Sequence, residues 1–274
     1  MRNAYSATLH DCWVSGRYPE GNYDGGLGLC TAYRTTITRG TMKYGGGASG
    51  GTLHDCTLVN NRGGTGGGGA YNSTLFNCTV SNNQARYGAG AQLSVVHNSL
   101  FIHNNGTDSG QGAVYRSTLY NCLLTGNTTS GTRESTLYNC TVVGNLVGVN
   151  DDIAVNTVAW YNRDSNYLND PVFTNACTYP EQAGWVTGNI TQAPQFVMYD
   201  SGSGFGLDHV PGDYRLAAGS PCTDQGLAFA WMRDPDDARS RDLDGTPRIL
   251  PRGGRVDIGA FERNIHQGTI LTVR

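Results

Sequence analysis

Charge is scarce in this chain, and long apolar runs are absent. Of 274 residues only 15% are charged, the net charge is −3, and Lys43 is the only lysine. A strongly basic protein is therefore excluded, which argues against nucleic acid as a partner. No stretch reaches the ~18 consecutive apolar residues that predict a membrane-spanning helix. The sequence also has no phosphate-binding loop, dinucleotide fingerprint or nucleophile elbow, so it gives no indication of the corresponding enzyme classes.

What the chain has instead is an internal repeat. A unit of about 22 residues recurs eight times before residue 162. It is clearest in Ser117-Thr-Leu-Tyr-Asn-Cys-Leu-Leu-Thr-Gly-Asn127 and Ser135-Thr-Leu-Tyr-Asn-Cys-Thr-Val-Val-Gly-Asn145. A fixed period of this length is typical of solenoids, in which most repeated residues serve the stacking of one coil on the next.

The cysteine of Thr-Leu-x-x-Cys marks the register of the repeat. Its position is filled by small side chains, namely Cys12, Thr35, Cys56, Cys78, Ser99, Cys122, Cys140 and Thr157. Apolar or small residues stand three places before it and two places after it, in short runs of alternating polarity that predict strands. We predict an all-β fold, a right-handed parallel β-helix of about eight coils over residues 1–162. Irregular final coils and a C-terminal cap follow over residues 163–274.

Two further columns support this architecture. Asn or Asp usually precedes the marker, and both residues tolerate the left-handed backbone of a sharp bend. Five places after the marker stand asparagines, which we expect to hydrogen-bond from coil to coil: Asn61, Asn83, Asn104, Asn127, Asn145 and Asn162.

The cysteines at the marker position are expected to be free thiols. Stacked Cβ atoms lie ~4.8 Å apart, wider than the ~3.8 Å that a disulfide prefers. Cys177 and Cys222 lie outside the repeat. They could form one disulfide or remain reduced; a disulfide would agree with an extracytoplasmic location.

The C-terminal third resembles a known family. The residues that carry the resemblance are Asp213-Tyr-Arg-Leu-Ala-Ala-Gly-Ser-Pro-Cys222, Arg241-Asp-Leu-Asp-Gly-Thr-Pro-Arg248 and Val256-Asp-Ile-Gly-Ala-Phe-Glu262. They are similar to the C-terminal module of bacterial right-handed β-helix proteins of the "choice-of-anchor Q" type, in the pectate-lyase-like superfamily. The resemblance implies a secreted or surface-displayed bacterial protein but no particular reaction. Because Tyr5 already lies within a repeat, we expect the chain to be part of a longer protein.

An outward column of rings, two places before the marker, is one candidate site. It includes His54, Phe76, His97, Tyr120 and Tyr138. Exposed rings suit stacking against sugars, so we predict that these five residues bind substrate. The alternative is that stacked rings only stabilise neighbouring strands.

A cluster of charged residues near the end of the repeat is the second candidate. Stacking would bring Glu134 within roughly 5 Å of Asp151, a separation like that of the carboxyl pair in retaining glycosidases. Glu134, Asp151 and Asp152 are the predicted catalytic residues, and Arg116 and Arg133 are predicted to position an acidic sugar. The alternative is a surface column of ion pairs that supports the last coils.

No cofactor is predicted. The alternative is Ca²⁺, for which the Asp242-Leu-Asp-Gly245 string offers oxygen ligands, although it lacks a complete calcium loop. The predicted partner is a polysaccharide. Two function classes remain open: a polysaccharide lyase or glycoside hydrolase working in a groove along one sheet, and a non-catalytic adhesin, glycan-binding module or spacer rod.

Overall fold

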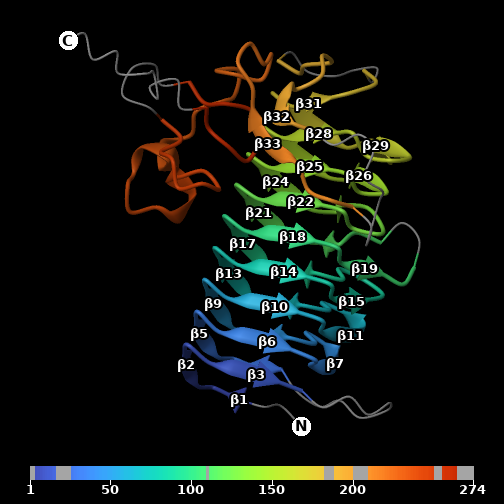
Figure 1. Cartoon of the computed structure of the whole chain (residues 1–274), viewed down its shortest axis with the longest axis vertical. Coiled ribbons are helices and arrows are strands. Elements are labelled where there is room, and N and C mark those ends of the chain that lie inside the picture. The colour runs from blue at the N-terminus through green and yellow to red at the C-terminus, as the bar shows by residue number, and fades with distance from the viewer. Residues whose placement is uncertain are drawn as a thin grey trace, which may run out of the picture.

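The structure, a computed structural model, describes residues 4–16, 26–108, 111–181, 188–199, 209–249 and 255–263. Figure 1 shows short strands stacked coil upon coil along the long axis of the molecule. All pairings within the stack are parallel, so the predicted parallel β-helix is confirmed.

Two nine-stranded parallel sheets run the length of the stack. The first, here named the ring sheet, contains the Thr-Leu-x segments: β2 (Thr8–His10), β5 (Thr31–Tyr33), β9 (Thr52–His54), β13 (Thr74–Phe76), β17 (Val95–His97), β21 (Thr118–Tyr120), β24 (Thr136–Tyr138), β27 (Ile153–Val155) and β30 (Val172–Thr174). The second contains the segments after the marker: β3 (Trp13–Ser15), β6 (Thr36–Thr38), β10 (Thr57–Val59), β14 (Thr79–Ser81), β18 (Leu100–Ile102), β22 (Leu123–Thr125), β25 (Thr141–Val143), β28 (Val158–Trp160) and β31 (Cys177–Thr178). The regular stack therefore extends one coil beyond the eight repeats visible in the sequence.

Shorter strands close each coil. A seven-stranded sheet contains β1 (Ala4–Tyr5), β4 (Leu27–Gly28), β8 (Ala48–Ser49), β12 (Ala70–Tyr71), β16 (Ala91–Gln92), β20 (Val114–Tyr115) and β23 (Thr132–Arg133). Smaller sheets contain β7 (Thr41–Tyr44), β11 (Arg62–Gly66), β15 (Gln84–Ala85) and β19 (Asn105–Gly106), and the pair β26 (Val147–Asn150) and β29 (Ser165–Leu168). The glycines before these strands allow close approach of the coils, since a Cβ atom on Gly69 would lie 2.6 Å from the carbonyl oxygen of Gly90.

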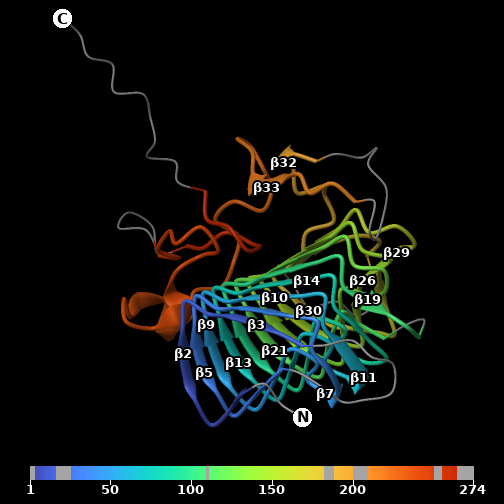
Figure 2. The same cartoon turned by 60° about the horizontal axis from the view of Figure 1, so that its bottom comes forward.

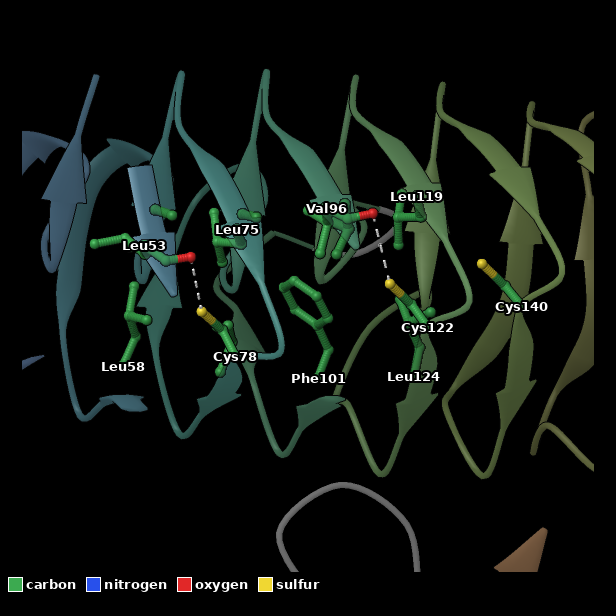
Figure 3. Packing of buried hydrophobic residues seen from close by; sticks show 14 of the residues in the cluster. Leu53, Leu58, Leu75, Cys78, Val96, Phe101, Leu119, Cys122, Leu124 and Cys140 are labelled. Atoms are coloured by element: carbon green, nitrogen blue, oxygen red, sulfur yellow. Dashed lines mark hydrogen bonds between the residues drawn. The ribbon is translucent and has the colours of Figure 1, made fainter. Parts of the chain in front are cut away.

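The core is made of files of identical positions, as the register predicts. Leu75 pairs with Val96, and Val96 pairs with Leu119. Figure 3 shows this file facing a second one that contains Phe101 and Leu124, with the sulfur atoms of the marker cysteines between them. All five side chains are buried.

Cysteine, serine and threonine interchange at the marker because each can donate a hydrogen bond to the carbonyl oxygen two residues earlier. The Sγ of Cys78 lies 3.3 Å from the Phe76 oxygen, and the Oγ of Ser99 lies 2.7 Å from the His97 oxygen. All eight cysteines are free, including Cys177 and Cys222. The expectation of free thiols at the marker is confirmed.

The asparagine ladder also forms. The amide nitrogen of Asn83 donates to Asn104 Oδ1 at 3.1 Å, and that of Asn104 donates to Asn127 Oδ1 at 3.1 Å. Each amide also binds the backbone, as when Asn104 Nδ2 donates to the Val80 carbonyl at 2.9 Å. The residues just before the marker have the predicted left-handed backbone, with φ of 53° at Asn77 and 55° at Asn121.

The cap packs along the side of the rod, from the coil of Asn98 to the last coils (Figure 2). It contains the antiparallel pair β32 (Phe196–Met198) and β33 (Asp213–Leu216) and the short 3-10 helices η2 (Ala230–Arg233) and η3 (Ala238–Ser240). An apolar cluster joins cap to coils: Phe196, Tyr214 and Ile258 of the cap pack with Val143 and Val158 of the second sheet. Burial of such side chains contributes ~1.5–3 kcal/mol each.

Candidate functional site

The predicted ring column is a continuous stack on the outer face of the ring sheet. Ring centroids of successive coils lie between 4.6 Å (Phe76 to His97) and 5.1 Å (His97 to Tyr120) apart. Interplanar angles are small, 5° between His54 and Phe76 and 7° between Phe76 and His97. The parallel strands hold equivalent residues at the coil spacing, which explains the face-to-face geometry.

The cap covers the part of this stack nearest the C-terminus. Trp231 meets Tyr120 edge-on at 5.9 Å, and Phe229 meets Tyr138 edge-on at 5.8 Å. The Arg239 guanidinium lies 5.2 Å from the Tyr120 ring centre. The outer surface of these two tyrosines therefore contacts the cap. This contact gives both residues a structural role, which competes with their predicted role in substrate binding.

His97 lies at the margin of the cap. Burial, with a smaller contribution from Arg239, lowers the pKa of His97 to about 4. Its ring is therefore neutral above that pH. This neutrality fits a ring that stacks between Phe76 and Tyr120 rather than one that carries charge.

The asparagines at the sheet corner attach the cap. Asn121 Nδ2 donates to the carbonyl oxygens of Arg239 at 3.0 Å and Arg241 at 2.7 Å. Asn156 exchanges two hydrogen bonds of 2.8 Å with the backbone of Leu227. The asparagines before the marker thus have two roles: they adopt the left-handed backbone of the corner, and they bind the cap. The second role was not predicted from the sequence.

A buried ion pair joins two of the C-terminal motifs. Arg248 is fully buried, donates to Glu262 Oε1 at 2.9 Å and donates through Nε to Asn121 Oδ1 at 3.0 Å. Burial raises the pKa of Glu262 to about 8, and the Arg248 charge opposes that rise. Two of the motifs that carry the family resemblance therefore supply residues that bind the cap to the rod.

The Ca²⁺ candidate belongs to the same structural unit. The carboxylate of Asp242 accepts hydrogen bonds from the backbone nitrogens of Thr246 at 2.6 Å and Glu262 at 2.7 Å. Burial raises the pKa of Asp242. Within the described ranges, no group of three or more His, Cys, Asp or Glu side chains is placed to hold a metal ion.

Where the cap leaves the ring stack, a groove of about 660 Å³ opens. Its rod side is formed by His54 and Phe76 together with three corner residues, Asp55, Asn77 and Asn98. Its cap side is formed by residues 235–238 and 241–245. The groove has aromatic side chains on the rod side and polar groups on both sides, so it is more polar than most small-molecule sites and can offer many hydrogen bonds to a ligand.

The predicted carboxylate cluster lies elsewhere, at the corner before the ring sheet. Glu134 accepts a hydrogen bond from Arg116 Nε at 2.7 Å and lies 3.5 Å from Arg133 Nε. The hydroxyl of Tyr115 lies 3.3 Å from both oxygens of Glu134. Glu134 and Asp151 occupy the same turn position of successive coils, both with left-handed backbone (φ 48° and 57°). The structure therefore brings Arg116, Arg133 and Glu134 together, with Asp151 one coil away.

Asp152 points in the opposite direction, into the core. It is 2% exposed and accepts hydrogen bonds from Thr132 Oγ1 at 2.7 Å, Ser135 N at 2.6 Å and Asn150 N at 2.7 Å. Burial raises the pKa of Asp152 to about 7. Its carboxylate is not displayed beside Glu134, because neighbouring residues of the chain face opposite ways at this corner.

The position of Asp152 has a sequence signal. The equivalent residue of the four preceding coils is Ser73, Ser94, Ser117 and Ser135. In each pair of coils, the hydroxyl of the later serine accepts a hydrogen bond from the backbone nitrogen of the earlier serine, as when Ser94 N donates to Ser117 Oγ at 3.1 Å. Asp152 ends this file of buried acceptors, so its column predicts an interior residue.

No helix in the described part of the chain is long and apolar enough to cross a membrane. No protein-family profile and no curated protein sequence matches this chain. Among solved structures, pectate lyase Pel9A is similar with a TM-score of 0.51 and 16% identity, over 93% of this chain and 68% of that one. The fluoroquinolone-resistance protein QnrB1 aligns with a TM-score of only 0.20 and 8% identity, over 68% of this chain and 72% of that one. The chain thus shares a parallel β-helix fold with pectate lyase Pel9A.

Proposed function

We propose that this chain is a carbohydrate-active β-helix protein that binds a polysaccharide in the groove between the ring stack and the cap. The observation that carries the proposal is the placement of His54 and Phe76 in that groove. Neighbouring rings of the stack cover the flat faces of His54 and Phe76, so these side chains offer their outer edges to a sugar, and the surrounding carboxylates and amides can accept or donate hydrogen bonds to hydroxyl groups. The similarity of fold to a pectate lyase makes a polysaccharide a reasonable ligand class, without defining which one.

The test is a binding measurement against neutral, cationic and acidic oligosaccharides. Phe76→Ala is expected to weaken binding about three- to tenfold, since an aromatic contact contributes ~0.5–1.5 kcal/mol. Trp13→Ala is the matched control, because Trp13 is an aromatic residue that is 72% exposed on the second sheet and does not line the groove. Equal weakening by both variants, or no binding of any glycan, would reject the proposal.

Catalysis at the other corner is a second candidate function. The specific observation in its favour is that Glu134 and Asp151 share one turn position on adjacent coils, which gives a carboxyl separation near the ~4.8 Å coil spacing. Arg116, paired with Glu134, would position an acidic sugar. Appearance of reducing ends or of absorbing unsaturated products, lost in Asp151→Ala and Glu134→Gln, would support a hydrolase or lyase. Binding without cleavage would leave the non-catalytic function, as an adhesin or glycan-binding rod.

We also propose, from the family resemblance of the C-terminal motifs, that the chain belongs to a secreted or surface-displayed bacterial protein. Detection of the protein on intact cells or in culture medium tests this location. Recovery from the cell interior alone would contradict it.

A further inference from the structure

We propose that the glycan held in the groove carries protonated amino groups, as in a polymer of 2-amino-2-deoxy sugars, and is not a polyuronate. This inference rests on the proposed function, namely that the groove binds a glycan. It concerns which charge the groove accepts.

Aspartates line the groove on both of its sides. Asp55 lies on the rod side, and Asp236 and Asp244 lie on the cap side. All three residues are exposed. One arginine, Arg241, lines the groove, and its Nη1 donates a hydrogen bond to the Gly245 carbonyl at 3.0 Å.

Two other aspartates of the lining are already satisfied within the protein. Asp237 is bound by the Arg239 guanidinium, with a shortest contact of 2.6 Å. Asp242 is buried and accepts two backbone hydrogen bonds. Setting these two aside, the lining contains three exposed aspartates and one arginine. Asp55 accepts one hydrogen bond, from Asn77 Nδ2 at 3.2 Å, but this neutral amide does not cancel its charge, so the lining has an excess of negative charge.

The same arrangement disfavours an acidic glycan. A uronate packed against the ring edges of His54 and Phe76 would bring its carboxylates among those of Asp55, Asp236 and Asp244, and like charges brought together repel. An amino sugar offers the opposite charge while keeping C–H groups that can pack against the ring edges. The carboxylates stand on opposite sides of an aromatic surface, which suits charges repeated along a chain better than one compact cation.

The experiment compares a glucosamine hexamer, its fully N-acetylated counterpart and a galacturonate hexamer at about pH 5.5, where the sugar amines are protonated. The glucosamine hexamer is expected to bind about three- to tenfold more tightly than the acetylated one at low salt, which corresponds to one or two weak ion pairs. That preference should shrink at high salt, because exposed charges are screened.

The variant Asp55→Asn with Asp236→Asn should lower glucosamine binding to the level of the acetylated hexamer. Asp108→Asn with Asp164→Asn is the matched control: it changes the net charge equally, and both aspartates are in ion pairs outside the groove, with Arg86 and Arg163. An equal loss in the control would show that overall charge, not the groove, selects the amine, and would overturn the inference. Equal binding of the glucosamine and N-acetylated hexamers, or tighter binding of the galacturonate hexamer with or without Ca²⁺, would also overturn the inference. If Phe76→Ala weakens the binding observed in either case, the proposed function stays in place. If none of the three hexamers binds, this inference fails, and the wider panel of oligosaccharides decides the proposed function.

Discussion

Removal of one ladder amide should destabilise the stack far more than its single side chain suggests. Asn104 is fully buried and lies in the middle of the ladder. Its Nδ2 donates to the Val80 carbonyl at 2.9 Å and to Asn127 Oδ1 at 3.1 Å, and its Oδ1 accepts from both Asn83 N and Asn83 Nδ2 at 3.1 Å. Asn104→Ala therefore leaves two donors and two acceptors of neighbouring coils without these partners.

The magnitude follows from the cost of buried unsatisfied polar groups, ~1–3 kcal/mol each. Because some of the groups keep another partner, we expect a total loss of about 3–5 kcal/mol in the free energy of unfolding. Urea-induced unfolding followed by circular dichroism measures this loss. The midpoint should fall with little change of slope, as the surface exposed on unfolding is nearly the same.

The next residue along the chain is the matched control. Asn105 is half-buried, and its side chain accepts one hydrogen bond, from Thr128 Oγ1 at 2.8 Å. Asn105→Ala should cost about 1 kcal/mol or less. If Asn104→Ala costs no more than Asn105→Ala, the ladder does not stabilise the coils and the reasoning is wrong.

Three further predictions concern the cap, a buried acid and the thiols. Arg248→Met leaves Glu262 buried without its cation and should lower the free energy of unfolding by about 3–5 kcal/mol, which faster proteolysis of the cap would reveal. Arg248→Met combined with Glu262→Leu should recover much of this loss. A double variant that recovers none of it would contradict the assigned ion pair. The raised pKa of Asp152 means that the folded state holds a proton that the unfolded state releases. The stabilisation from this group is therefore complete below about pH 4 and is lost as pH rises through about 7. Asp152→Asn should flatten the dependence of stability on pH over that range, and an unchanged dependence would show that Asp152 is not its cause. Cys12 is partly exposed while the other seven cysteines are buried, so a bulky thiol reagent should modify one thiol quickly in the native protein and eight after unfolding; fast native modification of several thiols would contradict the packing.

The repeat allowed most of the fold to be predicted, because each column of the stack is a local sequence pattern repeated at a fixed spacing. The marker cysteines and the ladder asparagines follow directly from that spacing. The ninth coil was not predicted, since Ala176 replaces the marker residue and Phe173 the leucine, yet Asn175 keeps the left-handed corner with φ of 46°. One changed residue at each position is enough to hide a coil that the backbone still forms.

The site was less predictable because it depends on contacts between distant segments. Nothing in the sequence pairs Trp231 with Tyr120 or Phe229 with Tyr138, so the coverage of the ring stack by the cap emerges only in three dimensions. The groove exists because that coverage stops short of Phe76. Asp152, by contrast, could have been assigned to the interior from its serine column.

A crystal structure with a bound oligosaccharide would test the central claim most directly. The account predicts a sugar ring packed against the outer ring edges of His54 and Phe76, within van der Waals distance of about 4 Å, with polar contacts to the cap segment 235–245. A glycan seated at the Glu134 corner, or anywhere that leaves the groove empty, would contradict it.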